Sequence, residues 1–220
     1  MPTVEEAWNN YRMNVGKANS RISSVLKPDS LLAAELKELL SGISNLATRI
    51  LSIDFIDWLE KKKMLPPAEA NDARKKIDET SANSNGYDIV LPKKIVAEVK
   101  CMIPLKDKNY GAQQQKSIKN DLEGLLAHFP KEKSSAQLEK ANIQREKCIK
   151  FMVLLNKNNA IVAFNNIPFV KKNVSCFKIV NCTGKIDECP NIVNVVFLPC
   201  EESIIAACGD GECEKVEEGN

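Results

Sequence analysis

Histidine is nearly missing from this sequence of 220 residues, since His128 is the only one. Nucleophilic catalysis of the Ser–His or Cys–His kind needs an imidazole next to the nucleophile. His128 follows an expected helix and precedes Phe129, a context typical of a capping or surface residue. The sequence therefore argues against both of these catalytic classes.

Cysteine pairs of the C-x-x-C type are also missing, although the chain has eight cysteines. A tetrahedral zinc site normally shows such pairs or nearby histidines, so the sequence argues against zinc. Cys101 and Cys148 lie in apolar, strand-like runs, where a free cysteine behaves as a small hydrophobe. The other six lie in the last quarter of the chain. We therefore expect reduced thiols rather than a disulfide scaffold.

No uninterrupted apolar run reaches the ~18 residues of a membrane-spanning helix. The polar, acidic start MPTVEEAWNN argues against a signal peptide. We therefore expect a cytoplasmic protein with no membrane partner.

The net charge of +2 conceals an uneven distribution. Residues 201–220 hold 7 acidic residues and 1 basic residue, which leaves 22 acidic and 30 basic residues, a net of +8, in residues 1–200. A basic body suits an anionic partner such as nucleic acid, but an ordinary lysine-rich surface gives the same charge.

Hydrophobic periodicity predicts helices in the first third of the chain and strands beyond residue 86. The expected helices are 4–26, 30–65 with an interruption at Gly42, 68–79 and 111–127, and the expected strands are 86–91, 94–103, 148–156, 174–182 and 191–199. This order predicts an α/β (α+β) fold with a central mixed sheet flanked by helices. We expect one domain over 1–200, made of a helical region (1–65), a core (81–156) and additional strands (157–200), followed by an acidic tail (201–220).

One expected strand, IVAEVK, carries two charged residues in a composition typical of a buried strand. Side chains alternate between the faces of a strand, so Glu98 and Lys100 share a face, with Cα atoms roughly 6.5–7 Å apart. A tight turn at Pro92–Lys93 would pair the preceding strand antiparallel to it, and Asp88 can then come opposite the stretch that holds Glu98, on the same face if the register allows. Two carboxylates and one ammonium would then converge.

Two carboxylates on rigid strands suit Mg²⁺ or Mn²⁺, with water and phosphate oxygens completing the coordination. A nearby ammonium can orient water or neutralise charge that develops on a phosphate. The alternative is a solvent-facing strand side with a weak Glu–Lys ion pair, worth less than about 1 kcal/mol. An unpaired buried charge is poorly tolerated, which favours a functional site.

The sequence Asp88, nine intervening residues, then Glu98-Val99-Lys100 resembles the PD-(D/E)xK nuclease superfamily, which includes most type II restriction endonucleases. Tyr87 replaces the usual Pro. The resemblance covers roughly residues 44–156 and implies an αβββαβ core. It also implies that Asp88, Glu98 and Val99 hold Mg²⁺, for which Mn²⁺ can substitute, and that Lys100 assists the attacking water.

Many members of that superfamily add a helix-borne acid or Gln near the metal. The candidates here are Glu60 as an accessory acid and Gln113 and Gln114 as contacts to DNA, each of which also fits an ordinary polar helix surface. Lys116 and Lys119 can reach a DNA backbone, or they are surface lysines.

The resemblance implies a Mg²⁺-dependent type II restriction endonuclease that cuts a specific site in double-stranded DNA. Cutting both strands of a symmetric site would require a homodimer, for which helices 4–26 and 30–62 could supply the interface. The alternatives are a repair or recombination nuclease with the same core, and a catalytically silent DNA-binding module. Base-reading residues usually sit on loops, and here they could lie in the segments 64–86, 104–115 or 157–190, which hold the expected loops.

Overall fold

The fold was analysed in a computed structural model that describes residues 6, 9, 12, 13, 30–79, 87–91, 95–105, 108–126, 147–180 and 184–199. The predicted helix 4–26 lies mainly outside these residues. The tail 201–220 and the charged segment 130–146 lie entirely outside them.

The described chain forms helices first and then alternates strands with helices. In chain order the elements are α2 (Ser30–Lys61), α3 (Pro67–Glu79), β1 (Ile89–Leu91), β2 (Ile95–Lys100), α4 (Ala112–Leu125), β3 (Ile149–Leu155), α6 (Ala160–Asn165), α7 (Pro168–Lys172), the 3₁₀ turn η2 (Val174–Cys176), β4 (Phe177–Val180) and β5 (Val193–Leu198).

The strands form one mixed sheet with the order β1-β2-β3-β5-β4. β1 pairs antiparallel with β2, and all other neighbours are parallel. Strands buried on both faces of a parallel sheet need apolar side chains on both sides, which explains the near-continuous apolar runs of β3 and β5. The predicted mixed sheet is confirmed. Between α3 and α4 the described residues contain two strands, whereas an αβββαβ core has three.

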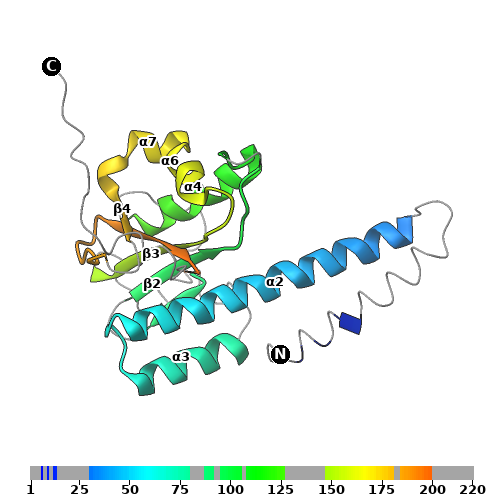
Figure 1. Cartoon of the computed structure of the whole chain (residues 1–220), viewed down its shortest axis with the longest axis horizontal. Coiled ribbons are helices and arrows are strands. Elements are labelled where there is room, and N and C mark those ends of the chain that lie inside the picture. Colours follow the sequence, from blue (N-terminus) through cyan, green and yellow to red (C-terminus); the bar gives the residue numbers. More distant parts are fainter. Residues whose placement is uncertain are drawn as a thin grey trace, which may run out of the picture.

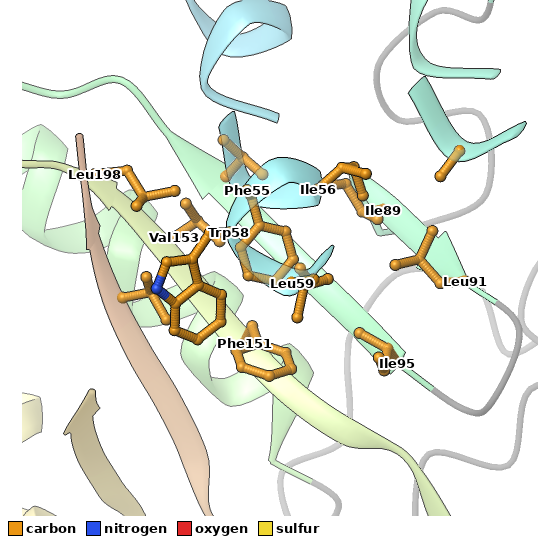
Figure 2. Close-up of a cluster of buried hydrophobic side chains, with 14 of the residues drawn as sticks. Phe55, Ile56, Trp58, Leu59, Ile89, Leu91, Ile95, Phe151, Val153 and Leu198 are labelled. Carbon is orange, nitrogen blue, oxygen red and sulfur yellow. The ribbon is translucent and has the colours of Figure 1, made fainter. Parts of the chain in front are cut away.

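Helices cover both faces of this sheet (Figure 1). α2 and α3 lie on one face, while α4, α6 and α7 lie on the other. Each face has its own apolar cluster. In the cluster under α2, Phe55 and Trp58 pack on Phe151 of β3, with ring centroids 5.1 and 6.0 Å from its ring (Figure 2).

Two helical predictions need correction. The expected interruption at Gly42 is wrong, because α2 runs through it without a break. Gly42 is exposed, and a Cβ there would meet nothing within 4 Å, so the glycine has only its intrinsic helix cost of about 1 kcal/mol. Residues 160–172, expected to be loop, form α6 and α7.

The segment Leu36–Lys61 of α2 is long and apolar enough to cross a membrane, judged by its 26 residues and mean hydropathy of 1.3 alone. The sequence lacks an uninterrupted apolar run of that length because charged residues are interspersed. In the fold, Leu51, Phe55, Ile56 and Leu59 of this segment pack into the core of the sheet.

Two leucines of α2 give a matched test of this packing. Leu59 is fully buried and Leu40 is 65% exposed. We expect Leu59→Ala to lower the free energy of unfolding by about 2–5 kcal/mol because it leaves a cavity. Leu40→Ala should change it by less than about 0.5 kcal/mol. Denaturant unfolding of both variants checks this, and equal effects would contradict the described packing of α2.

Candidate active site

Strand β2 divides its side chains between the two faces of the sheet as the alternation predicts. Ile95, Ala97 and Val99 belong to the apolar cluster under α2. Val96 belongs to the cluster on the α4 side, and Lys100 pairs with a residue of α4. Glu98 lies between them on that side and is only 3% exposed. A carboxyl group is therefore buried in the second strand of a five-stranded sheet.

Asp88 lies across the hairpin from Glu98. The antiparallel register pairs Ile89 with Ala97, so Asp88, one residue earlier, comes opposite Glu98. The carboxylate is fixed by the strand itself, because the backbone N–H of Val99 donates to Asp88 Oδ2 over 2.8 Å. The sequence left this register open, because a two-residue turn at Pro92–Lys93 would pair Leu91 with Lys94 and bring Asp88 opposite Ala97. The observed pairing of Leu91 with Ile95 is shifted by one residue and brings Asp88 to the same face as Glu98.

Lys100 reaches from β2 to helix α4. Its Nζ lies 2.8 Å from Oδ2 of Asp121, and both side chains are largely buried. Asp121 was not among the site residues predicted from the sequence. The fold thus brings together four charged side chains: Asp88, Glu98, Lys100 and Asp121.

The electrostatics of this group follow from burial and from its charges. Burial is the main reason that the pKa of Asp88 is raised, and the nearby charge of Asp121 adds to it. The hydrogen bond from Val99 and the charge of Lys100 oppose that rise. For Lys100, burial alone would lower the pKa, but the Asp121, Asp88 and Glu98 carboxylates raise it above its usual value. Lys100 is therefore held as an ammonium ion.

The charged group lies toward the carboxyl end of β2, where Lys100 is the last residue of the strand. β3 runs parallel to β2, with Leu154 beside Lys100, so the two strands end at the same edge of the sheet. Ligands of open α/β sheets bind outside the carboxyl ends of parallel strands. The segment from Cys101 to Gly111 connects this edge to α4.

The glutamines and lysines predicted to contact DNA have different surroundings on α4. The Gln114 side chain caps the helix: its Oε1 accepts from the Gly111 N–H over 2.9 Å, and its Nε2 donates to the Ile103 carbonyl over 3.1 Å. Gln113 and Lys116 are exposed. Lys119 pairs with Glu123 at 3.2 Å. Among the residues predicted to contact DNA, Gln114 therefore already uses its side-chain oxygen and nitrogen in hydrogen bonds within the fold.

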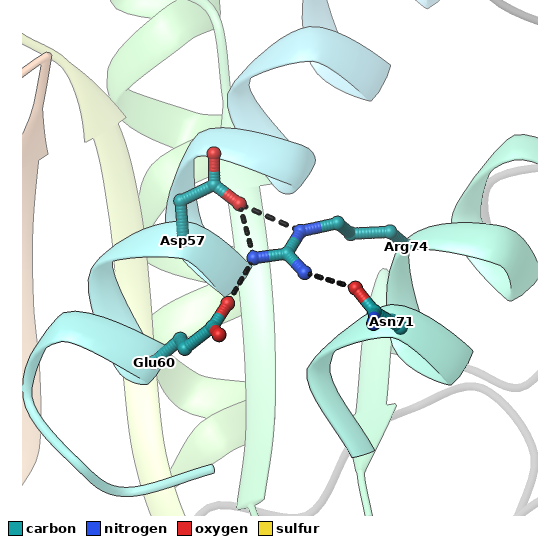
Figure 3. A network of polar contacts seen from close by, with 4 residues as sticks. All are labelled: Asp57, Glu60, Asn71 and Arg74. Atoms are coloured by element: carbon teal, nitrogen blue, oxygen red, sulfur yellow. Dashed lines mark hydrogen bonds and ion pairs between the residues drawn. The ribbon is translucent and has the colours of Figure 1, made fainter. Parts of the chain in front are cut away.

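Glu60, the predicted accessory acid, is held in a different network. Arg74 of α3 binds Glu60 and Asp57 of α2, and also donates to Asn71 over 2.8 Å (Figure 3). These contacts tie α3 to α2, and α2 covers the face of the sheet opposite α4. The structure therefore does not bring Glu60 together with the four charged residues.

The site offers a divalent cation two adjacent carboxylates, Asp88 and Glu98. Within the described part of the chain, no group of three or more His, Cys, Asp or Glu side chains is arranged to hold a metal ion. Mg²⁺ is commonly held by one or two carboxylates, with water and phosphate oxygens as its other ligands. Burial raises the pKa of Asp88, and a cation bound between the two carboxylates would oppose that rise.

The four described cysteines, Cys101, Cys148, Cys176 and Cys189, are free thiols. Cys101 follows Lys100 and packs against the apolar cluster under α2, where its thiol contacts Thr48. Burial raises the pKa of its thiol to about 11, so the thiol is protonated near neutral pH.

Comparisons of the chain with protein-family models, with curated proteins and with solved structures found no match.

The Asp88 carboxyl predicts a specific dependence of stability on pH. Because its native pKa is raised, the folded chain binds this proton more tightly than the unfolded chain. Its stabilising contribution is complete below the unfolded-state pKa and is lost as pH rises through the native pKa. We expect Asp88→Asn, which keeps an acceptor for the Val99 N–H, to remove this loss. In metal-free buffer the stability of the variant should therefore rise relative to that of the native protein as pH rises.

Thermal unfolding at several pH values, with EDTA and with Mg²⁺, measures both effects. Mg²⁺ should raise the Tm of the native protein and leave that of Asp88→Asn nearly unchanged. Asp72→Asn, at an exposed position of α3, is the control, and its Tm should respond to pH and Mg²⁺ as that of the native protein does. An equal response of Asp88→Asn and native protein to Mg²⁺ would exclude Asp88 as a metal ligand.

Proposed function

We propose that this protein is a Mg²⁺-dependent endonuclease that hydrolyses phosphodiester bonds of double-stranded DNA, with Asp88, Glu98 and Lys100 as its catalytic residues. The observation that carries the proposal is the convergence of these side chains on one face of the hairpin β1–β2, with Glu98 buried. Burying a carboxylate costs several kcal/mol unless it is compensated, so its retention on a core strand favours a working group over a surface charge.

The chemistry follows from these positions. A divalent cation would be held by Asp88 and Glu98 with the carbonyl of Val99, and when bound it polarises the phosphate and lowers the pKa of water. The residues themselves are held in place, since Asp88 is fixed by the Val99 N–H and Glu98 by its position within β2. Because these carboxylates are already in position, their negative oxygens need not move during the reaction.

Lys100 supplies positive charge at the same site. Because its pKa is raised, it is an ammonium ion, which suits it to orient a water molecule and to neutralise charge on the phosphate. No covalent nucleophile is required for this reaction. The described residues also offer no histidine that could act as one.

The PD-(D/E)xK resemblance favours a type II restriction endonuclease acting as a homodimer in a prokaryotic cytoplasm. A repair or recombination nuclease would use the same residues. One observation favours a catalytically silent DNA-binding module instead: Lys100 and Asp121 form a closed ion pair at 2.8 Å, which can serve the fold alone.

Cleavage of supercoiled plasmid DNA in Mg²⁺ or Mn²⁺ tests the proposal. We expect Glu98→Gln and Lys100→Ala to reduce the cleavage rate by at least about a hundredfold, the scale for removing one electrostatic group from an active site. Asp72→Asn should cleave at the native rate, and the Tm of each variant confirms folding. The proposal fails if the native protein leaves the plasmid intact in both metals, or if both site variants cleave normally.

The fragment pattern separates the two kinds of nuclease. Discrete fragments of a sequenced plasmid would indicate a site-specific restriction enzyme. Cleavage confined to branched, damaged or single-stranded regions would indicate a repair or recombination enzyme.

A further inference from the structure

The side of the molecule formed by α4 and α7 carries exposed lysines. Lys116 and Lys119 lie on the outer side of α4, and Lys171 and Lys172 lie in the last turn of α7. Lys108, in the segment before α4, is also exposed. We call these five residues the lysine face.

These lysines belong to one surface because side-chain contacts join the elements that carry them. Lys119 Nζ lies 5.9 Å from the centroid of the Phe169 ring on α7. Lys172 is three residues after Phe169, and residues at this spacing are neighbours on a helix. The segment that carries Lys108 is tied to the end of α6, since Asn166 Nδ2 donates to the Lys108 carbonyl over 3.1 Å.

The acidic residues of α4 leave most of this positive charge uncompensated. Asp121 pairs with Lys100 and Glu123 pairs with Lys119. Among the residues that the structure describes, no ion pair engages Lys108, Lys116, Lys171 or Lys172. The sequence shows the same bias, since residues 147–186 contain seven lysines and no Asp or Glu.

The lysine face also adjoins the candidate active site through α4. This helix carries Asp121 toward Lys100 and carries Lys116 and Lys119 on its exposed side. An α-helix with its side chains is about 10–12 Å across. The major groove of DNA is about 12 Å wide, which is close to the width of such a helix. A duplex with its scissile phosphate at the active site can therefore bring neighbouring phosphates to the lysines on the outer side of α4.

We propose that the lysine face binds the phosphate backbone of the nucleic acid on which the active site acts. The inference rests on the proposed nuclease function for its ligand and adds the surface and the kind of contact. Lysine ammonium groups on phosphates release counterions, which gives affinity without reading sequence. Helices α4 and α7, together with the segment that carries Lys108, then form the positioning surface of the enzyme.

Two adjacent lysine pairs on opposite sides of the sheet allow a matched test. Lys171→Gln/Lys172→Gln removes two charges from the lysine face. Lys75→Gln/Lys76→Gln removes two exposed charges from α3, on the other side. Binding of a fluorescent DNA duplex of about three helical turns is measured by anisotropy in EDTA at several salt concentrations. EDTA prevents cleavage, so binding is read independently of catalysis.

We expect Lys171→Gln/Lys172→Gln to weaken binding about tenfold near 0.1 M salt and to reduce the slope of log K against log salt by up to about 2. Lys116→Gln, added to this variant, should lower affinity and slope further. Lys75→Gln/Lys76→Gln should match the native protein.

The inference is overturned if the α7 variant binds as the native protein does, if the α3 variant loses as much affinity, or if the native protein does not bind the duplex. The proposed nuclease function is judged separately, by plasmid cleavage. If the native protein cleaves DNA and the α7 variant binds and cleaves normally, the nuclease proposal stands and the lysine-face proposal is wrong. If the α7 variant loses binding and the native protein does not cleave DNA, the lysine face stands as a DNA-binding surface and the nuclease proposal is wrong.

Discussion

The burial of Glu98 in strand β2 is the constraint on which the rest of the site depends. A carboxyl group that is 3% exposed, between β1 and β3 and under α4, loses nearly all of its hydration. The fold places one compensating positive charge near it, Lys100 on the same strand, together with two further carboxyl groups: Asp88, fixed by the Val99 N–H, and Asp121, paired with Lys100. Each of these needs the sheet register and the docking of α4 to be correct. The positions of the four charged side chains therefore depend on the same tertiary contacts.

Local rules were enough to predict most of the strand part of this arrangement. Side-chain alternation placed Glu98 and Lys100 on one face, and the expected hairpin placed Asp88 beside the stretch that holds Glu98, although the structure was needed to select the register that brings the two opposite each other. Both rules act over a few residues, so they do not depend on the rest of the chain. The mixed sheet and the boundaries of α3, α4 and β3 were predictable for the same reason.

The parts that were missed depend on contacts between distant segments. Asp121 is one of several charged residues on α4, and only the packing of that helix on β2 selects it as the partner of Lys100. One signal was available, since Asp121 directly precedes Leu122 on the buried stripe of the helix. Gln114 looked like a DNA contact, but its position three residues after the N-cap Gly111 makes it a capping residue. The helices α6 and α7 are too short to show a helical period.

The residues that flank the charged group also hold the helix that completes it. Tyr87, next to Asp88, donates its hydroxyl to the Gly124 carbonyl of α4 over 3.0 Å. Beyond Lys100, the Ile103 carbonyl accepts from Gln114 of the same helix. Helix α4 is thus attached on both sides of Asp121. This gives a physical reason for Tyr at the position where the resemblance would place Pro: a proline could not make the hydrogen bond that fixes α4, and the position of Asp121 depends on that helix.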